Sequence, residues 1–169
     1  MKIYKNFNIG KKFQNSAIAV GNFDGFHLGH QKVIKKGKQI AKRNRLKFGL
    51  MVFQPLPVMF FNKKLKNYRI DSLQQKIDSS KKYRIDFLII KKFDKKFSNI
   101  RSEDFIERIL YKKLKTKLIF ISKNFRFGKN RTGDIKLLKK YGVDFIINIK
   151  FNKSFSKISA LNFIKKIIF

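Results

Sequence analysis

The chain reads VGNFDGFHLGH from Val20 to His30, directly after an apolar run that starts at Ser16. Glycines let the backbone of a turn approach a ligand closely, and a helix after such a turn presents free N–H groups to an anion. The imidazoles of His27 and His30 are spaced to donate hydrogen bonds to phosphate oxygens as charge builds during phosphoryl or nucleotidyl transfer. The stretch therefore predicts a strand, a phosphate-binding turn and a helix in succession. The alternative is a pair of surface histidines in a glycine-rich turn.

Apolar runs alternate with helix-like segments along the rest of the chain. Strands are expected at 16–20, 46–53, 85–90, 118–122 and 144–149, and helices at 31–43, 72–82, 102–112, 134–141 and 160–168. This alternation predicts an α/β fold, a Rossmann-like, doubly wound and mostly parallel five-stranded sheet, in a single domain over residues 1–169. Ligands of such sheets bind beyond the carboxyl ends of the strands, so the loops after Val20, Phe53 and Ser122 should meet there.

Composition narrows the class of protein. Hydrophobic residues make up 43% of the 169 residues, too many for a disordered chain. Cysteine is absent, which excludes a disulfide framework and a thiolate zinc site. No apolar run approaches the length of a membrane span, and the first residues lack the apolar core of a secretory signal. We expect a cytoplasmic protein with no membrane partner.

Charge is the unusual feature, with 42 Lys+Arg against 10 Asp+Glu and a formal net charge of +32. One interpretation is an electrostatic footprint for nucleic acid or an acidic membrane surface. The other is compositional drift, since the enriched Lys, Asn, Ile and Phe all have A/T-rich codons and the lysines are spread along the whole chain. We favour drift and expect no nucleic-acid partner. Positive potential should still attract anionic substrates.

Two further motifs follow expected strands. The segment Phe53-Gln54-Pro55-Leu56-Pro57 predicts a stiff extended loop, which suits a ligand wall and a plain rigid connection equally well. Residues 123–133, KNFRFGKNRTG, combine Asn124, basic residues and aromatic residues between glycine turns. Such a loop can contact a phosphate and a flat ring together. A basic surface hairpin is the alternative.

These motifs resemble the HxGH nucleotidyltransferase superfamily, and more closely the FAD synthetase (FMN adenylyltransferase) module of the bacterial bifunctional riboflavin kinase/FAD synthetases. The family opening reads like GNFDGVHLGHQ, and this chain has GNFDGFHLGHQ. Pro55 and Pro57 match a pattern like TFxPHP, in which Val52 and Leu56 replace the threonine and the histidine. Residues 124–133 are similar to DFxFGxxxxG, with Asn124 at the first position. The resemblance covers about residues 16–149.

The resemblance implies transfer of AMP from ATP to FMN, giving FAD and pyrophosphate, with Mg²⁺ accompanying ATP and no metal ligands assigned. It implies catalytic roles for His27 and His30. The implied nucleotide-binding residues are Gly21, Asn22, Phe23, Asp24, Gly29, Asn124 and Ser159. The implied flavin-binding residues are Pro55, Pro57, Phe61, Phe105 and Phe127. Because the chain has 20 Phe, plain core packing is the alternative for any one of them.

The tail departs from the family pattern. Of a late motif resembling KISSTRIR, the chain keeps Lys157-Ile158-Ser159, while Asn162 and Ile164 stand at the arginine positions. Arginine binds phosphate oxygens bidentately, so its loss predicts a weaker hold on ATP and weakened activity. The family continues beyond the position of Phe169 into a riboflavin kinase module, so we expect no kinase activity and a separate riboflavin kinase as the source of FMN. Two alternatives stay open: another HxGH transferase, and a nucleotide-, flavin- or nucleic-acid-binding protein without turnover.

Overall fold

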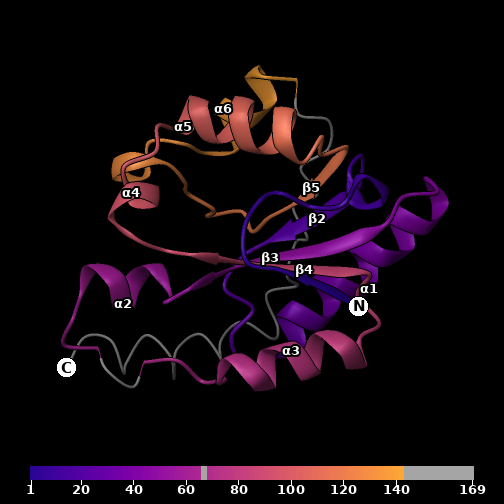
Figure 1. Ribbon diagram of the computed structural model, residues 1–169, viewed down its shortest axis with the longest axis horizontal. Coiled ribbons are helices and arrows are strands. Elements are labelled where there is room, and N and C mark those ends of the chain that lie inside the picture. Colours follow the sequence, from indigo (N-terminus) through magenta and orange to yellow (C-terminus); the bar gives the residue numbers. More distant parts are fainter. Residues whose placement is uncertain (66–67, 143–169) are drawn as a thin grey trace.

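A computed structural model of the chain describes residues 1–65 and 68–142, and it places helices on both sides of one five-stranded sheet (Figure 1). The strands lie in the order β1-β4-β3-β2-β5, and every neighbouring pair is parallel. Their bounds are β1 Lys2–Tyr4, β2 Ala17–Val20, β3 Phe48–Gln54, β4 Phe87–Lys92 and β5 Leu118–Phe120. The predicted α/β class with a parallel sheet is confirmed.

Four of the five strands are those that the sequence predicts, and the fifth is new. Strand β1 pairs with β4 at the edge of the sheet, with Lys2 opposite Phe87. Its sequence, Lys-Ile-Tyr, lacks the run of apolar residues that marks the equally short β5, so the sequence pattern did not indicate it. The strand expected at 144–149 and the helix expected at 160–168 lie outside the described residues.

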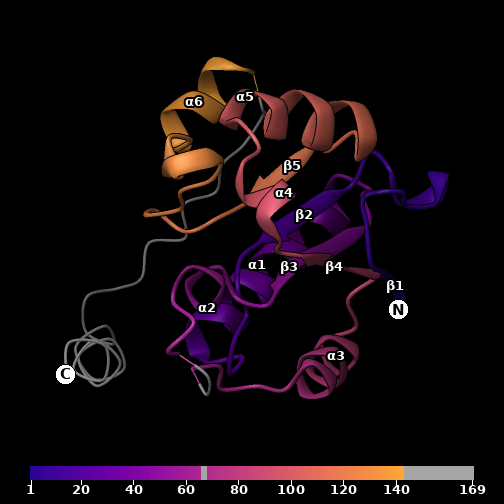
Figure 2. The same ribbon diagram turned by 60° about the vertical axis from the view of Figure 1, so that its left-hand side comes forward.

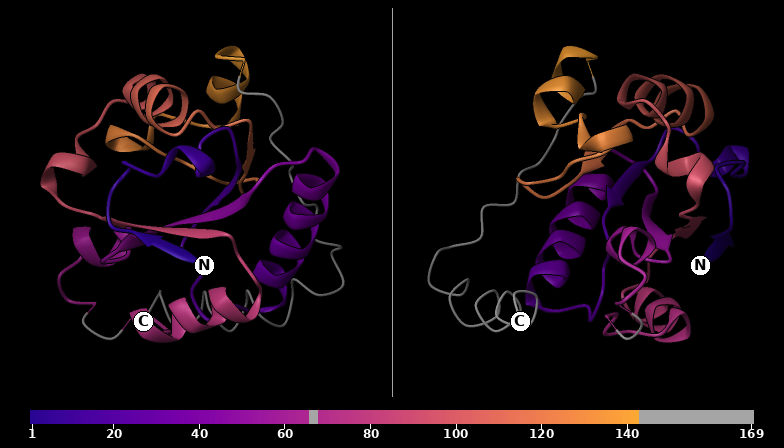
Figure 3. Two further views of the ribbon diagram at one scale, coloured as in Figure 1. Left: turned by 45° about the vertical axis from the view of Figure 1, so that its right-hand side comes forward. Right: turned by 90° about the vertical axis from the view of Figure 1, so that its left-hand side faces the viewer.

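The sheet separates two hydrophobic cores. Along β2, Ile18 and Val20 belong to one core while Ala17 and Ala19 belong to the other, so the strand is buried on both faces. Helices α1 (Leu28–Arg43) and α3 (Leu73–Lys82) cover the alanine side. The opposite side is covered by α6 (Ile135–Lys140) and by α5 (Ser102–Asp104) with its π-helical continuation (Figure 2, and the left view of Figure 3).

Helix ends follow local capping chemistry, with two corrections. Helix α1 begins at Leu28, three residues earlier than expected, so His30 lies in its first turn. Helix α5 spans Ser102–Asp104 and continues as a π-helix over Phe105–Lys113, and the side chain of Ser102 does not cap it. Ser72 caps α3 through a capping box with Gln75, and this helix lies within the predicted range 72–82. Asp134 caps α6 with its side chain alone, by accepting from the amide of Leu137.

The proline segment is not the extended loop that the sequence predicts. Strand β3 runs through Gln54, and Pro57 is the first residue of α2 (Pro57–Phe61). Proline suits this place because the first N–H groups of a helix have no partner within the helix. The short helix α4 (Lys95–Ser98) likewise begins soon after a strand, β4.

The order of the strands creates a switch point at β2. The chain passes from β2 to β3 and β4 on one side and returns to β5 on the other. The segments that leave β2 and its neighbours β3 and β5 therefore emerge at one edge, where α/β sheets bind ligands. None of the helices in residues 1–65 and 68–142 has the length and apolarity that crossing a membrane requires.

Candidate functional site

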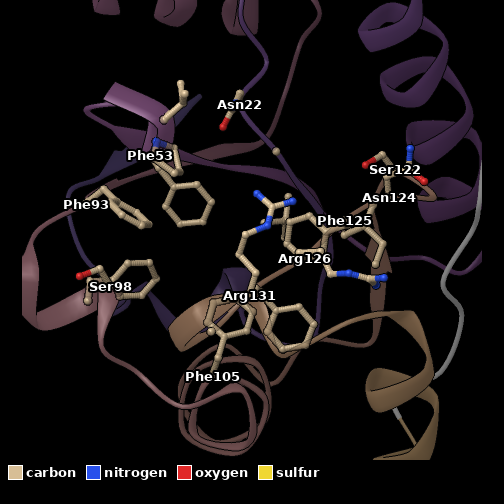
Figure 4. Close-up of a pocket in the computed structure, with 18 of the residues that line it drawn as sticks. Asn22, Phe53, Phe93, Ser98, Phe105, Ser122, Asn124, Phe125, Arg126 and Arg131 are labelled. Carbon is tan, nitrogen blue, oxygen red and sulfur yellow. The ribbon is translucent and has the colours of Figure 1, made fainter. Parts of the chain in front are cut away.

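A cavity of about 1010 Å³ opens at this edge of the sheet (Figure 4). The turn after β2, the first turn of α1, helix α2 and the loop after β5 all contribute to its lining. Ten of the residues that the sequence singles out line it: Gly21, Asn22, Phe23, His27, His30, Pro57, Phe61, Phe105, Asn124 and Phe127. Asp24, Gly29 and Pro55 do not line it. Ser159 lies outside the described residues.

His27 sits at the N-cap of α1. Its Nδ1 accepts a hydrogen bond from the amide of Gly29 at 3.1 Å, so the neutral ring carries its proton on Nε2. This bond uses the Gly29 N–H and leaves Nε2–H of His27 available as a donor. The backbone of the turn thereby selects the tautomer that can serve a phosphate oxygen.

His30 stacks on His27, with ring centroids 3.8 Å apart. Burial, together with the nearby His27 and Lys76, lowers the pKa of His30 to about 3. Burial also lowers the pKa of His27, although Asp24 opposes the shift. Both rings are therefore neutral at pH 7, and Nδ1 of His30 is buried without a hydrogen-bond partner in the described part of the chain. The pair offers neutral donors and avoids two adjacent buried charges.

The turn between β2 and α1 has a strained backbone. Gly25 has φ of 73°, and two residues with side chains, Phe23 and Phe26, have φ of 44° and 35°. Asp24 supports this turn instead of facing the cavity, since its carboxylate accepts from the amides of Ile70 at 2.8 Å and Asp71 at 3.1 Å. Sequence reasoning grouped Asp24 with the nucleotide contacts because a motif does not show which way a side chain points.

The loop after β5 is fixed to the start of α5. The Ser102 hydroxyl lies 2.6 Å from the Thr132 hydroxyl, and the amide of Lys129 donates to the carbonyl of Ile100 at 2.6 Å. Gly128 passes this contact with φ of 74°, where a Cβ would collide with Ser102. These contacts hold a short 3-10 turn, Lys129–Arg131, against the cavity.

That loop supplies the cavity with three cations, Arg126, Lys129 and Arg131, and none of the described lining residues is acidic. Arg126 lies 3.3 Å from Asp134, whereas Arg131 extends toward the middle of the cavity (Figure 4). Sequence reasoning noted the basic loop without choosing among its members, because which side chain faces inward depends on the turn at 129–131. The lining therefore favours an anionic ligand.

A wall of aromatic rings forms part of the cavity lining. Phe53 stacks on Phe97 at 5.7 Å, Phe97 meets Phe105 at 6.4 Å, and Phe105 meets Phe127 at 5.3 Å. Phe61, which is 70% exposed, lies at the rim. The sequence placed Phe53 in the proline motif without assigning it a ligand, and it did not single out Phe97. The available signal was the position of Phe53 at the carboxyl end of a predicted strand.

The described lining offers little for a metal ion alone. Residues 1–65 and 68–142 contain no group of three or more His, Cys, Asp or Glu placed to bind one. The amide oxygen of Asn124 is a neutral oxygen donor at the cavity. Mg²⁺ commonly binds through substrate phosphates and few protein ligands, so the residues present fit a magnesium ion that arrives with a nucleotide.

Comparison with known proteins identifies the family of the chain. A family model described as FAD synthetase matches residues 9–142. The chain belongs to the FAD synthetase family. Relatives include proteins named bifunctional riboflavin kinase/FMN adenylyltransferase from Buchnera aphidicola of Schizaphis graminum and from Haemophilus influenzae. The first is 40% identical over 86% of this chain and 47% of its own length, and the second is 33% identical over 88% and 48%. The chain thus spans about half the length of these relatives.

Solved structures show the same fold. A macrolide-efflux protein from Streptococcus pneumoniae aligns with a TM-score of 0.66 and 24% identity, over 82% of this chain and 46% of that one. A pantoate-β-alanine ligase from Francisella tularensis aligns with a TM-score of 0.55 and 16% identity, over 90% of this chain and 69% of that one. At these identities the likeness concerns the fold alone.

The histidine pair predicts a distinctive titration. The chain has two histidines, so an NMR spectrum of labelled imidazoles contains two sets of signals. The signal of His30 should stay that of a neutral ring down to pH 4, and that of His27 should titrate below its ordinary 6.5. A His27→Asn variant assigns the signals. Ordinary titration of both rings near pH 6.5 would contradict the buried, stacked arrangement.

Gly128 predicts a stability difference against a matched glycine. Gly128→Ala should lower the free energy of unfolding by about 1–3 kcal/mol more than Gly142→Ala, because the new Cβ collides with Ser102. Gly142 has a similar φ of 61°, and no atom of the described residues lies within 4 Å of such a Cβ, so the backbone cost is shared. Urea unfolding measures both. Equal losses would show that the loop does not rest on Ser102.

Proposed function

We propose that the chain is an FMN adenylyltransferase, which transfers AMP from ATP to FMN and releases FAD and pyrophosphate. The observation that carries the proposal is a single cavity in which two neutral stacked imidazoles, an acid-free cationic loop and an aromatic wall come together. Membership of the FAD synthetase family and the names of its relatives support the same activity.

Different parts of the cavity lining suit the isoalloxazine ring and the phosphates of the product. The flat, apolar isoalloxazine ring fits against the wall that contains Phe53, Phe97 and Phe105. The phosphates fit between the turn at 21–23 and the side chain of Arg131. A ligand bound in this way places the phosphate of FMN near the imidazoles and leaves its ring in apolar surroundings.

The reaction needs positioning and charge stabilisation more than a covalent step. A phosphate oxygen of FMN forms a bond to the α-phosphorus of ATP, the bond from that phosphorus to the bridging oxygen breaks, and pyrophosphate leaves. Nε2–H of His27 donates to the phosphate on which charge builds, and His30 donates beside it. Asn124, which lines the cavity, would help to hold a magnesium ion that arrives with ATP, and such an ion would neutralise part of the phosphate charge.

Further parts of the proposal concern the setting of the reaction. We place the protein in the cytoplasm, where a separate riboflavin kinase supplies FMN, and we assign it no nucleic-acid or membrane partner. Asn124 serves the nucleotide, Phe61 and Phe127 serve the flavin, and Ser159 contributes to the phosphates from the segment beyond the described residues.

The competing function is binding of nucleotide or flavin without turnover. It is favoured by Asn162 and Ile164, which replace the arginines of the family's late motif. Incubation of the purified protein with ATP, Mg²⁺ and FMN, followed by separation of the flavins, decides between the two. FAD formation supports the transferase, and tight binding of FMN without FAD supports the binding protein.

The histidines should dominate turnover. His27→Ala or His30→Ala should reduce the rate of FAD formation about 100-fold or more, the scale expected for loss of one transition-state donor. Flavin affinity, measured by fluorescence quenching, should change little. Leu28→Ala is the control, since Leu28 lies between them, is 61% exposed and does not line the cavity. Near-normal turnover in both histidine variants would remove the role assigned to them.

Arg131 should contribute binding energy for the anionic substrates. Arg131→Gln should raise the KM for ATP or FMN about tenfold, because a charge-assisted hydrogen bond is worth about 1.5–3 kcal/mol. Arg45→Gln is the matched control, because both residues have left-handed backbones, with φ of 58° and 57°, and Arg45 is exposed and outside the cavity lining. Steady-state kinetics with each substrate varied measures the effect. Equal constants in the two variants would show that Arg131 holds no phosphate.

A further inference from the structure

Lys76 is a buried lysine on α3, and its side chain is only 4% exposed. Burying an ammonium group is costly unless it is paired and hydrogen-bonded, so this position calls for an explanation. No residue of α3, all of which is described, lines the cavity, and the chemistry proposed above does not use this helix. The ammonium nevertheless reaches the turn that builds the site.

Two contacts join Lys76 to that turn. Nζ donates a hydrogen bond to the carbonyl oxygen of Asn22 at 2.8 Å and lies 3.7 Å from Oδ1 of Asp24, whose side chain is 9% exposed. The carboxylate of Asp24 is in turn fixed by the amides of Ile70 and Asp71. Asp71 also accepts from the amide of Gly25 at 2.8 Å. The segment before α3 and α3 itself thus clamp the turn from one side.

The clamped turn is the strained one. Phe23 and Phe26 have left-handed backbones, which residues with side chains seldom adopt unless the surroundings hold them there. Their rings also pack against His30, with centroids 5.0 Å and 6.5 Å from the imidazole. Displacement of the turn therefore displaces the ring of His30, and with it the stack on His27.

We infer that Lys76 is a positioning residue for the transfer reaction: its ammonium fixes the Asn22 carbonyl and the Asp24 carboxylate, and thereby places the imidazoles of the first turn of α1. This inference rests on the proposed function for its kinetic consequence. Its structural consequence, the placement of His30, is independent of turnover.

Electrostatics adds a second effect of the same lysine. Among residues 1–65 and 68–142, the charged groups that act on Lys76 are Asp24, Asp71 and Arg69, and those that act on His30 are His27 and Lys76. The positive charge of Lys76 contributes, after burial and His27, to lowering the pKa of His30. Loss of that charge should therefore raise the pKa of His30 toward its ordinary value.

The test compares Lys76→Met with Lys82→Met in the full chain. Methionine keeps the length of the apolar stem without the charge, and Lys82 is an exposed lysine on the same helix. Lys76→Met should lower kcat for FAD formation about tenfold to 100-fold, the scale of an error in positioning, with KM for FMN within about twofold. NMR should show His30 titrating at higher pH than in the wild type, and Lys82→Met should match the wild type in both measurements.

A merely structural role would lower the melting temperature and leave kcat per folded molecule and the titration of His30 unchanged, which would overturn the inference. If Lys76→Met fails to fold because Asp24 is left unpaired, Lys76→Met with Asp24→Asn removes both charges and is measured in the same way. Failure of both to fold would make Lys76 a folding residue and also overturn the inference. If the wild type forms no FAD, the proposed function fails, while the titration of His30 still decides the role of Lys76.

Discussion

The position of β2 between β3 and β5 is the constraint on which the site depends. Strand β2 is buried on both faces and hydrogen-bonded to a parallel strand on each side. Backbone groups can therefore contact a ligand only where the strand ends. Its carboxyl end lies where the chain reverses the order of the strands, so the segments that leave β2, β3 and β5 converge there. This arrangement brings the glycine-rich turn, the aromatic wall and the cationic loop to one cavity from distant parts of the chain.

The cavity combines buried neutral groups with positive charge, and the two support each other. A neutral imidazole can donate its N–H to a phosphate oxygen without placing a positive charge in a buried position. The burial that keeps His30 neutral also strengthens each hydrogen bond that the ring makes. Arg131 and Lys129 then carry the positive charge at the surface of the cavity, where hydration lowers its cost. Separating the charge from the donors avoids cations stacked at 3.8 Å, the distance between the imidazole centroids.

The sequence predicts most of the sheet because buried parallel strands appear as runs of apolar residues. The runs that correspond to β2, β3 and β4 are long enough to be recognised in the sequence. It does not predict β1, whose three residues form a strand only because the exposed edge of β4 accepts them. It predicts that His27, His30 and Asn124 share an edge of the sheet, since motif order and strand topology determine that. It does not predict that Asp24 turns toward the amides of Ile70 and Asp71, because those amides come from a segment about forty-six residues away in the chain. Side-chain direction depends on such distant partners.

The surplus of positive charge acts at two ranges. Most of the basic residues in the described part of the chain do not line the cavity, and charges further than about 8–10 Å from a ligand are largely screened at physiological salt. They increase the rate of encounter with anionic substrates but add little to the affinity for a bound phosphate. That affinity depends on the few cations that line the cavity, and among them Arg126 is partly neutralised by Asp134. A basic composition can therefore coexist with a specific site, because the turn at Lys129–Arg131 determines which charges reach the ligand.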